Sequence, residues 1–270
     1  MPNRPPLQFY NEPLAGVDVG DLQGKLIVIE GPDAVGRSTQ IARLRQWLEQ
    51  EGHAVLDSGM ARSALAGKGI QQAKEGNTLQ PITMTLFYAT DFADRLENEI
   101  IPALRAGFVV LMDRYIFSIM ARAIARGENR AWINRLAGFA LVPHAVYYLR
   151  AEVKDLITRV VVGKGAFDYW ESGLDLGFGP EMYTSFLRYQ SRLIRVFDQL
   201  AVPYGFQVVD ASQSADQVFN ELKSSILTIF EPQAEAPAAP GTRAPKKKSS
   251  ATPKKGPSRS SARNKVASAL

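Results

Sequence analysis

The feature that most constrains the fold is a glycine-flanked turn, residues 31–36, between a short apolar run and a helical pattern. Residues 26–29 are all apolar, as expected of a strand that is buried on both faces. After the turn, Ile41, Leu44 and Leu48 recur at helical spacing. A buried strand, a glycine turn and a helix form the opening unit of a parallel α/β domain.

Residues 31–39 read Gly-Pro-Asp-Ala-Val-Gly-Arg-Ser-Thr, with the spacing of the phosphate-binding pattern G-x-x-x-x-G-K-[ST]. In such a loop, backbone N–H groups surround phosphate oxygens at the positive end of the following helix, and the hydroxyl at the Ser38 position is a ligand for Mg²⁺. An ordinary glycine turn is the alternative, and the flanking strand, spacing and helix favour phosphate binding. The residues expected to bind phosphates are Gly31, Pro32, Asp33, Ala34, Val35, Gly36, Arg37, Ser38 and Thr39.

Arg37 stands where this pattern has lysine. Arginine keeps the positive charge, but its planar fork is larger than an ammonium and aims its donors differently. Arg37 could therefore bridge two phosphate oxygens, or it could misplace the transferred group and slow the reaction.

The rest of the body alternates between strand and helix patterns. Further strands are expected at residues 54–56, 108–112, 145–149 and 206–209. Helical patterns cover about 82–104, 116–126, 131–139, 153–161, 181–200 and 215–230. This order predicts a doubly wound, five-stranded parallel sheet with helices on both faces. Residues 1–23 are expected to form an N-terminal extension, residues 24–230 the domain, and residues 231–270 a disordered tail.

Net charge divides the chain at residue 230. The whole chain carries +5. Residues 231–270 hold nine basic and two acidic residues, a net of +7, while the other 23 basic and 25 acidic residues leave −2 for the body. The tail is rich in Ala, Pro, Ser and Lys and has no aromatic residue, so it is expected to stay disordered. Its charge favours weak contact with nucleic acid or anionic surfaces.

Composition excludes several other classes of protein. There is no cysteine, and the two histidines, His53 and His144, are far apart, so a disulfide framework, a thiolate nucleophile and a zinc–thiolate site are excluded. The longest apolar runs are about five residues, far short of a membrane span. We expect a cytoplasmic protein without a membrane partner.

Several segments resemble the thymidylate kinase family in the same order along the chain. Residues 25–40 (KLIVIEGPDAVGRSTQ) resemble its phosphate-binding segment, and residues 87–89 (FYA) its F-x-A segment. Residues 102–104 (PAL), Gly107, residues 113–115 (DRY) and Ser118 resemble its P-A-L…G…D-R-Y-x-x-S signature. Residues 163–172 (GKGAFDYWES) resemble its lid, which we expect to cover about residues 163–180.

The resemblance implies a nucleoside monophosphate kinase that moves the γ-phosphoryl group of ATP, with Mg²⁺, onto an acceptor, most simply dTMP. Asp113 ends a predicted strand, where a carboxylate could hold Mg²⁺ together with Ser38. The implied catalytic residues are Asp33, Arg37 and Arg114. The resemblance also places Arg159 and Lys164 on the ATP side, although both could be ordinary surface cations. Acceptor-binding residues are expected to be Asp33, Arg62, Phe87, Asp91, Arg114 and Tyr115. Family membership further suggests a homodimer.

Three departures from the family bear on the acceptor and on turnover. Arg37 replaces the lysine, Asp91 replaces an arginine that contacts thymine, and the T-R-E-P element is missing. Arg62 or Lys68 could substitute for the arginine of that element. An aspartate accepts hydrogen bonds, for example from the amino group of cytosine, so acceptor preference could have moved to dCMP, CMP or dUMP. Alternatively, Asp91 pairs with Arg95 and dTMP remains the acceptor.

Two other functions stay open at this stage. The chain could be a nucleotide-binding regulatory protein with weak catalysis, which Arg37 and the missing arginine favour. It could instead act mainly on nucleic acid through its tail, which the near-neutral body opposes.

Overall fold

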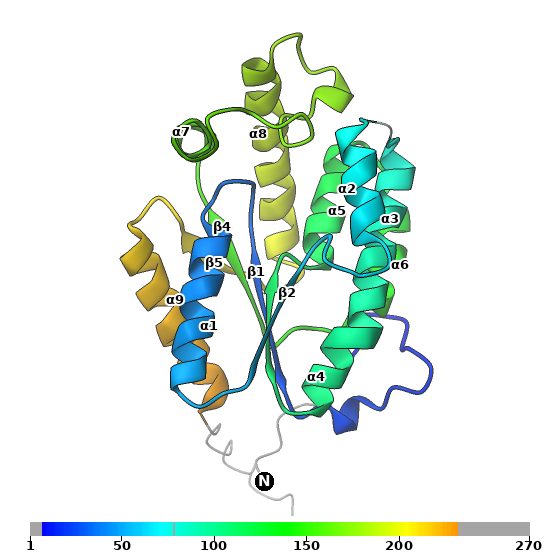
Figure 1. The fold of residues 1–270 in the computed structure, drawn as a ribbon, viewed down its shortest axis with the longest axis vertical. Coiled ribbons are helices and arrows are strands. Elements are labelled where there is room, and N and C mark those ends of the chain that lie inside the picture. The colour runs from blue at the N-terminus through cyan, green and yellow to red at the C-terminus, as the bar shows by residue number, and fades with distance from the viewer. Residues whose placement is uncertain (1–6, 78, 232–270) are drawn as a thin grey trace, which may run out of the picture. The chain divides into compact units, whose positions relative to one another are not determined.

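A single parallel sheet organises the computed structural model, which describes residues 7–77 and 79–231 (Figure 1). Its strand order is β2-β3-β1-β4-β5, and all four strand pairs are parallel. The strands are β1 (Lys25–Glu30), β2 (Val55–Gly59), β3 (Val109–Asp113), β4 (Ala145–Arg150) and β5 (Gln207–Asp210). The predicted five-stranded parallel sheet is confirmed.

Helices cover both faces of this sheet (Figure 1). They are α1 (Arg37–Gln50), α2 (Gly67–Glu75), α3 (Pro81–Arg95), α4 (Ile101–Arg105), α5 (Ile116–Ala125), α6 (Arg130–Leu136), α7 (Val153–Lys164), α8 (Met182–Ala201) and α9 (Ala215–Phe230). Side chains of β1 alternate between two cores, as the period of a strand requires. Leu26 and Val28 belong to the core that contains residues of α3, α5 and α8, whereas Ile27 and Ile29 belong to the core with α1 and α9.

The predicted long helix over 82–104 is present, with a local change in its winding. A π-helical turn, Leu96–Ile100, separates α3 from α4. Pro102, two residues after the turn, has no N–H to donate to residue 98, so the regular hydrogen-bond ladder is interrupted at this point. The turn keeps Leu96, Ile100 and Ile101 in the core.

Two segments differ from the sequence expectation or extend it. Helix α2 was not predicted, because Gly67 and Gly69 lower its helix propensity. In the N-terminal extension, Phe9 forms an antiparallel bridge with Leu141, and Leu7 is buried in the core. No helix within the described residues is long and apolar enough to span a membrane. The predicted disordered tail lies outside the described residues, apart from Glu231.

Candidate active site

The loop between β1 and α1 has a backbone that its glycines make possible. Gly31 adopts a φ of +148° and Gly36 a φ of +101°, both in the region that disfavours side chains. A Cβ atom on Gly31 would lie 2.6 Å from the carbonyl oxygen of Leu149 on β4. Helix α1 begins at Arg37, so its positive end faces the loop. This is the geometry of an anion-binding loop.

Arg37 turns its guanidinium back into the loop. Its Nη1 donates to the carbonyl oxygen of Gly31 at 2.7 Å and also to that of Pro32. Its Nε donates to Asp113 Oδ1 at 2.9 Å. With 7% of its surface exposed, Arg37 links the loop to the end of β3.

Ser38 and Asp113 form the second pair at this position. Ser38 Oγ donates to Asp113 Oδ2 at 3.2 Å, and the register of the sheet places Asp113 beside Ile29 at the end of β1. Burial acts to raise the pKa of Asp113, but the guanidinium groups of Arg37 and Arg114 outweigh it and lower that pKa. Asp113 is therefore ionised at neutral pH, next to a hydroxyl oxygen.

Asp33 lies in the loop between two arginines. Arg122 Nη2 donates to both carboxylate oxygens of Asp33, at 2.8 and 2.9 Å, and Arg114 Nη2 donates to Oδ1. Asp33 is 2% exposed. Burial opposes ionisation, but the charges of Arg122, Arg114 and Arg37 hold the pKa of Asp33 well below its usual value. The three side chains form one cluster, which we call the Asp33–Arg114–Arg122 triad.

Two nitrogen donors of this triad have no acceptor among the described residues. Arg114 Nη1 and Arg122 Nε are buried and have no hydrogen-bond partner among the described residues. Buried guanidinium N–H groups without an acceptor are costly, and an anion beside the triad would satisfy them. Arg114 reaches this place from a left-handed backbone conformation, φ +72°, directly after β3.

Arg122 was not among the site residues predicted from the sequence. A signal was present, because Arg122 is the only charged residue in helix α5, in which every other residue except Ser118 is apolar. A charge within an apolar helix needs a buried partner, and here that partner is Asp33. The structure thus places an unpredicted arginine beside Asp33 of the loop.

Asp91 supports the chain after β2 rather than facing a ligand. It is fully buried, and its oxygens accept from the N–H groups of Ala61 and Ser63 at 2.9 and 2.8 Å. Arg95 donates to Asp91 Oδ2 at 2.9 Å through Nη2. Of the two alternatives for Asp91, the structure contains the pair with Arg95.

The other expected acceptor residues lie in different settings. Arg62 is half exposed and pairs with Asp57 at 2.9 Å, while Phe87 is half-buried against Gly69 of α2. The expectation that Tyr115 contacts an acceptor is corrected: its side chain is fully buried, and its hydroxyl donates to the carbonyl oxygen of Leu141 at 2.8 Å. The aromatic ring of Tyr115 packs edge-on against Phe92, so this residue serves the core.

One cavity lies beside the loop, and a second lies between α2 and residues 168–170. The first, of about 230 Å³, lies beside Gly36 and Thr39 and is lined by Arg159. Arg159 Nη1 donates to the carbonyl oxygen of Val35 at 2.8 Å, and Nη2 donates to that of Ala211 after β5. The other, of about 540 Å³, is lined by α2, Tyr88 and residues 168–170. Lys164 ends α7, and its side chain is outside the described part of the chain.

Fold and site together define a P-loop kinase that acts on nucleoside monophosphates. The family model for thymidylate kinase matches residues 29–222. The chain belongs to the thymidylate kinase family. It is 35% identical over 180 residues to the probable thymidylate kinase 2 of Saccharolobus solfataricus, covering 67% of this chain and 84% of that protein. It is 32% identical over 221 residues to the thymidylate kinase of Bifidobacterium longum subsp. infantis, covering 77% and 88%.

Proposed function

We propose that this protein transfers the γ-phosphoryl group of ATP to a nucleoside monophosphate, most simply dTMP, with the help of Mg²⁺. The observation that carries the proposal is the Asp33–Arg114–Arg122 triad beside the phosphate-binding loop. It supplies two buried, unpartnered guanidinium N–H groups within one side-chain length of the loop that would hold ATP. Phosphoryl transfer depends mainly on positioning and on neutralising charge, and this site concentrates cations.

The acceptor phosphate is assigned to Arg114 and Arg122. Both side chains are mostly buried, with 15% and 13% exposed, so charge-assisted hydrogen bonds from them would be strong. Asp33 holds both guanidinium groups in place through the contacts described above. Because its pKa is low, Asp33 stays anionic and acts here by orienting the arginines and the acceptor.

Ser38 and Asp113 have the right chemistry to hold Mg²⁺. A hydroxyl and an ionised carboxylate are hard oxygen donors, and their hydrogen bond of 3.2 Å places them side by side. When bound, Mg²⁺ would neutralise charge on the β- and γ-phosphates. Arg37 already contacts Asp113 and the loop carbonyls, so it would keep this carboxylate oriented and add a positive charge beneath the phosphates.

Each of the two cavities suits a different substrate. The cavity beside Gly36, Thr39 and Arg159 adjoins the end of the loop and suits the adenosine part of ATP. The cavity between α2, Tyr88 and residues 168–170 is on the side of the acceptor residues and suits its base. The two relatives named above are a probable thymidylate kinase and a thymidylate kinase, which favours dTMP. Since the oxygens of Asp91 already accept from Ala61, Ser63 and Arg95, a hydrogen bond to cytosine would have to displace one of these contacts.

A transfer assay with ATP, Mg²⁺ and a panel of dTMP, dUMP, dCMP and CMP tests the proposal. We expect turnover with at least one acceptor and the highest kcat/KM with dTMP. A preference for dCMP or CMP would instead support a shifted acceptor. Omitting Mg²⁺ should abolish turnover with each acceptor.

A regulatory protein with weak catalysis is the second candidate. The contacts of Arg37 favour it, because a guanidinium bound to two loop carbonyls and Asp113 must give up contacts before it can reach the γ-phosphate. Tight ATP binding without turnover on any acceptor of the panel would favour this candidate over the kinase.

A further inference from the structure

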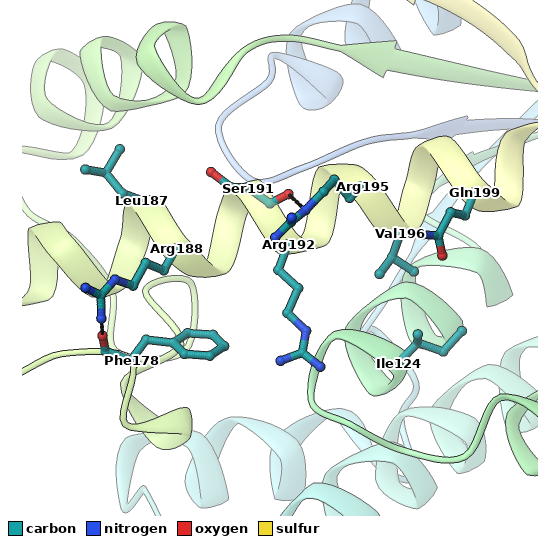
Figure 2. A pocket seen from close by; sticks show the side chains of 9 residues that line it. All are labelled: Ile124, Phe178, Leu187, Arg188, Ser191, Arg192, Arg195, Val196 and Gln199. Atoms are coloured by element: carbon teal, nitrogen blue, oxygen red, sulfur yellow. Dashed lines mark hydrogen bonds between the residues drawn. The ribbon is translucent and has the colours of Figure 1, made fainter.

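A cavity of about 690 Å³ lies along α8 (Figure 2). Helix α8 forms one wall, Ile124 near the end of α5 lies on the opposite side, and Phe178 lies at one end. None of its lining residues belongs to the site described above. Its volume falls in the range of small-molecule sites, about 300–1,000 Å³.

Three arginines of α8 line this cavity. Arg188, Arg192 and Arg195 stand at i, i+4 and i+7, so they lie along one side of the helix. Arg188 donates to the carbonyl oxygen of Phe178, and Arg195 Nε donates to that of Ser191 at 3.3 Å. Arg188 and Arg195 are exposed, and Arg192 is half-buried. None of the three forms an ion pair within residues 7–77 and 79–231, whereas the buried Arg37, Arg95 and Arg126 do. Like charges at this spacing repel one another, and an anionic ligand would relieve the repulsion.

The cavity also offers an apolar surface beside the charges. The ring of Phe178 lies between the side chains of Arg188 and Arg192 (Figure 2), and the guanidinium carbon of Arg192 is 5.9 Å from the centroid of that ring. A planar group could stack on the ring or on the flat guanidinium. Ile124 supplies aliphatic contact on the other side of Arg192.

We infer that this cavity is a second, non-catalytic site for a nucleoside polyphosphate, which we call the α8 site. The phosphates would contact Arg188, Arg192 and Arg195, and the base would pack against Phe178. At a rise of 1.5 Å per residue, Arg188 and Arg195 are about 10 Å apart along the helix axis, a distance that flexible arginine side chains can adjust to a chain of phosphates. A ligand of this class uses both features of the cavity, whereas an inorganic anion would use the charges alone.

Equilibrium dialysis with radiolabelled ATP, without Mg²⁺ or acceptor, tests the inference on the full-length protein. We expect two nucleotides per chain for the wild type. Arg192 makes no hydrogen bond among the described residues, so Arg192→Ala and Arg192→Glu should fold normally, as far-UV circular dichroism can verify. Each should weaken one of the two sites at least tenfold. Arg135→Ala, which removes an exposed arginine of α6 outside the cavity, should keep both sites.

One nucleotide per chain in the wild type, or two sites of unchanged affinity in Arg192→Glu, would overturn the α8 site. The measurement does not depend on phosphoryl transfer, so two binding sites in a protein without turnover would reject the proposed reaction and leave this inference standing.

A second comparison distinguishes the contacts of the base from those of the phosphates. Phe178→Ala should weaken ATP binding at the α8 site about tenfold, by loss of stacking, and should leave the affinity for inorganic tripolyphosphate within twofold. Equal losses for both probes, or no loss for ATP, would contradict the contact between base and ring.

Discussion

At the scale of single residues, the assignment of Arg122 to the acceptor phosphate can be tested against Arg62. Arg122→Met removes a buried, charge-assisted donor, which is worth about 1.5–3 kcal/mol, so the KM for the acceptor should rise about 10- to 100-fold. Arg122→Lys keeps the charge and should recover part of this loss. Steady-state kinetics with varied acceptor and saturating ATP measures both variants.

Arg62→Met is the matched control for that comparison. Arg62 is half exposed and pairs with Asp57, and exposed pairs contribute about 0–1 kcal/mol. Its acceptor KM should change by less than about fivefold. If the acceptor KM rises more in Arg62→Met than in Arg122→Met, the acceptor phosphate is bound by Arg62, as the sequence suggested.

Glu30, at the end of β1, makes a pH-dependent contribution to stability. It is fully buried and accepts from the N–H groups of Tyr115 and Ser118 and from Ser118 Oγ. Burial raises its pKa above the usual 4.5 despite these bonds and the charges of Arg37 and Arg114. The folded state therefore binds the proton more tightly than the unfolded state, so this group favours folding most at low pH, and that advantage is lost as pH rises from 4.5 through the folded pKa.

Glu30→Gln should remove this pH dependence. Glutamine can accept from both N–H groups and donate to Ser118 Oγ, and it carries no buried charge. Urea unfolding at pH 8 should show a free energy of unfolding equal to the wild type or about 1 kcal/mol higher, and the difference should disappear near pH 4.5. A variant less stable than the wild type at pH 8 would show that the charge itself stabilises this site.

The positions of site residues relative to one another followed from the sequence where the motif is contiguous. The loop and the pair Asp113 and Arg114 come together as expected, because parallel register fixes the ends of β1 and β3 at one edge of the sheet. The apolar residues around Arg122 indicate that it needs a buried partner, but they do not identify that partner, which depends on how α5 packs against the loop about 90 residues away in sequence. For Asp91, the i,i+4 spacing offered an ion pair with Arg95 as one of two alternatives. The complete burial of the Asp91 side chain favours this pair over a contact with the acceptor.

At the scale of elements, Arg126 connects the end of α5 to residues 165–181, between α7 and α8. Its Nε donates to Asp175 at 2.9 Å, and its other nitrogens donate to Tyr189 of α8 and to the carbonyl oxygen of Trp170. Trp170 in turn donates to the carbonyl oxygen of Lys74 at the end of α2. The expected lid is thus held to two helices by buried polar contacts.

Arg126→Met should loosen this segment. Removing one partner of a buried pair costs about 3 kcal/mol, and limited proteolysis should then cut within residues 165–181 before the rest of the chain. Arg130→Met, which loses an exposed bond to Gln199, should cost less than about 1 kcal/mol and leave the cleavage pattern unchanged. Equal protection of the segment in both variants would show that it is held by other contacts.

The elements themselves were predictable to different degrees. Buried strands and amphipathic helices have strong periodic signals, which is why all five strands lie close to their expected positions. Helix α2 has two glycines within its first three residues, and its stability comes from packing of Ile70 in the core rather than from propensity. The π-helical turn before Pro102 likewise depends on how the long helix meets the core.

At the scale of the whole molecule, charge and catalysis belong to different parts of the chain. The described core residues all lie between Leu7 and Ile226, in a body with a net charge near −2, while the tail carries +7. The proposed reaction uses a few positioned cations, Arg37, Arg114 and Arg122, and none of these is in the tail. Binding to nucleic acid, if the tail provides it, should therefore separate from kinase activity.

Deleting residues 233–270 should make this separation measurable. Kinase kcat and KM should stay within about twofold of the full-length values, because Arg37, Arg114 and Arg122 all lie in the body. Affinity for duplex DNA, measured by fluorescence anisotropy at several salt concentrations, should fall to background in the shortened protein. In the full-length protein the slope of log K against log salt should not exceed about 8 in magnitude, the limit for nine phosphate contacts. DNA binding that survives the deletion would place it on the body, and a loss of kinase activity would give the tail a catalytic role.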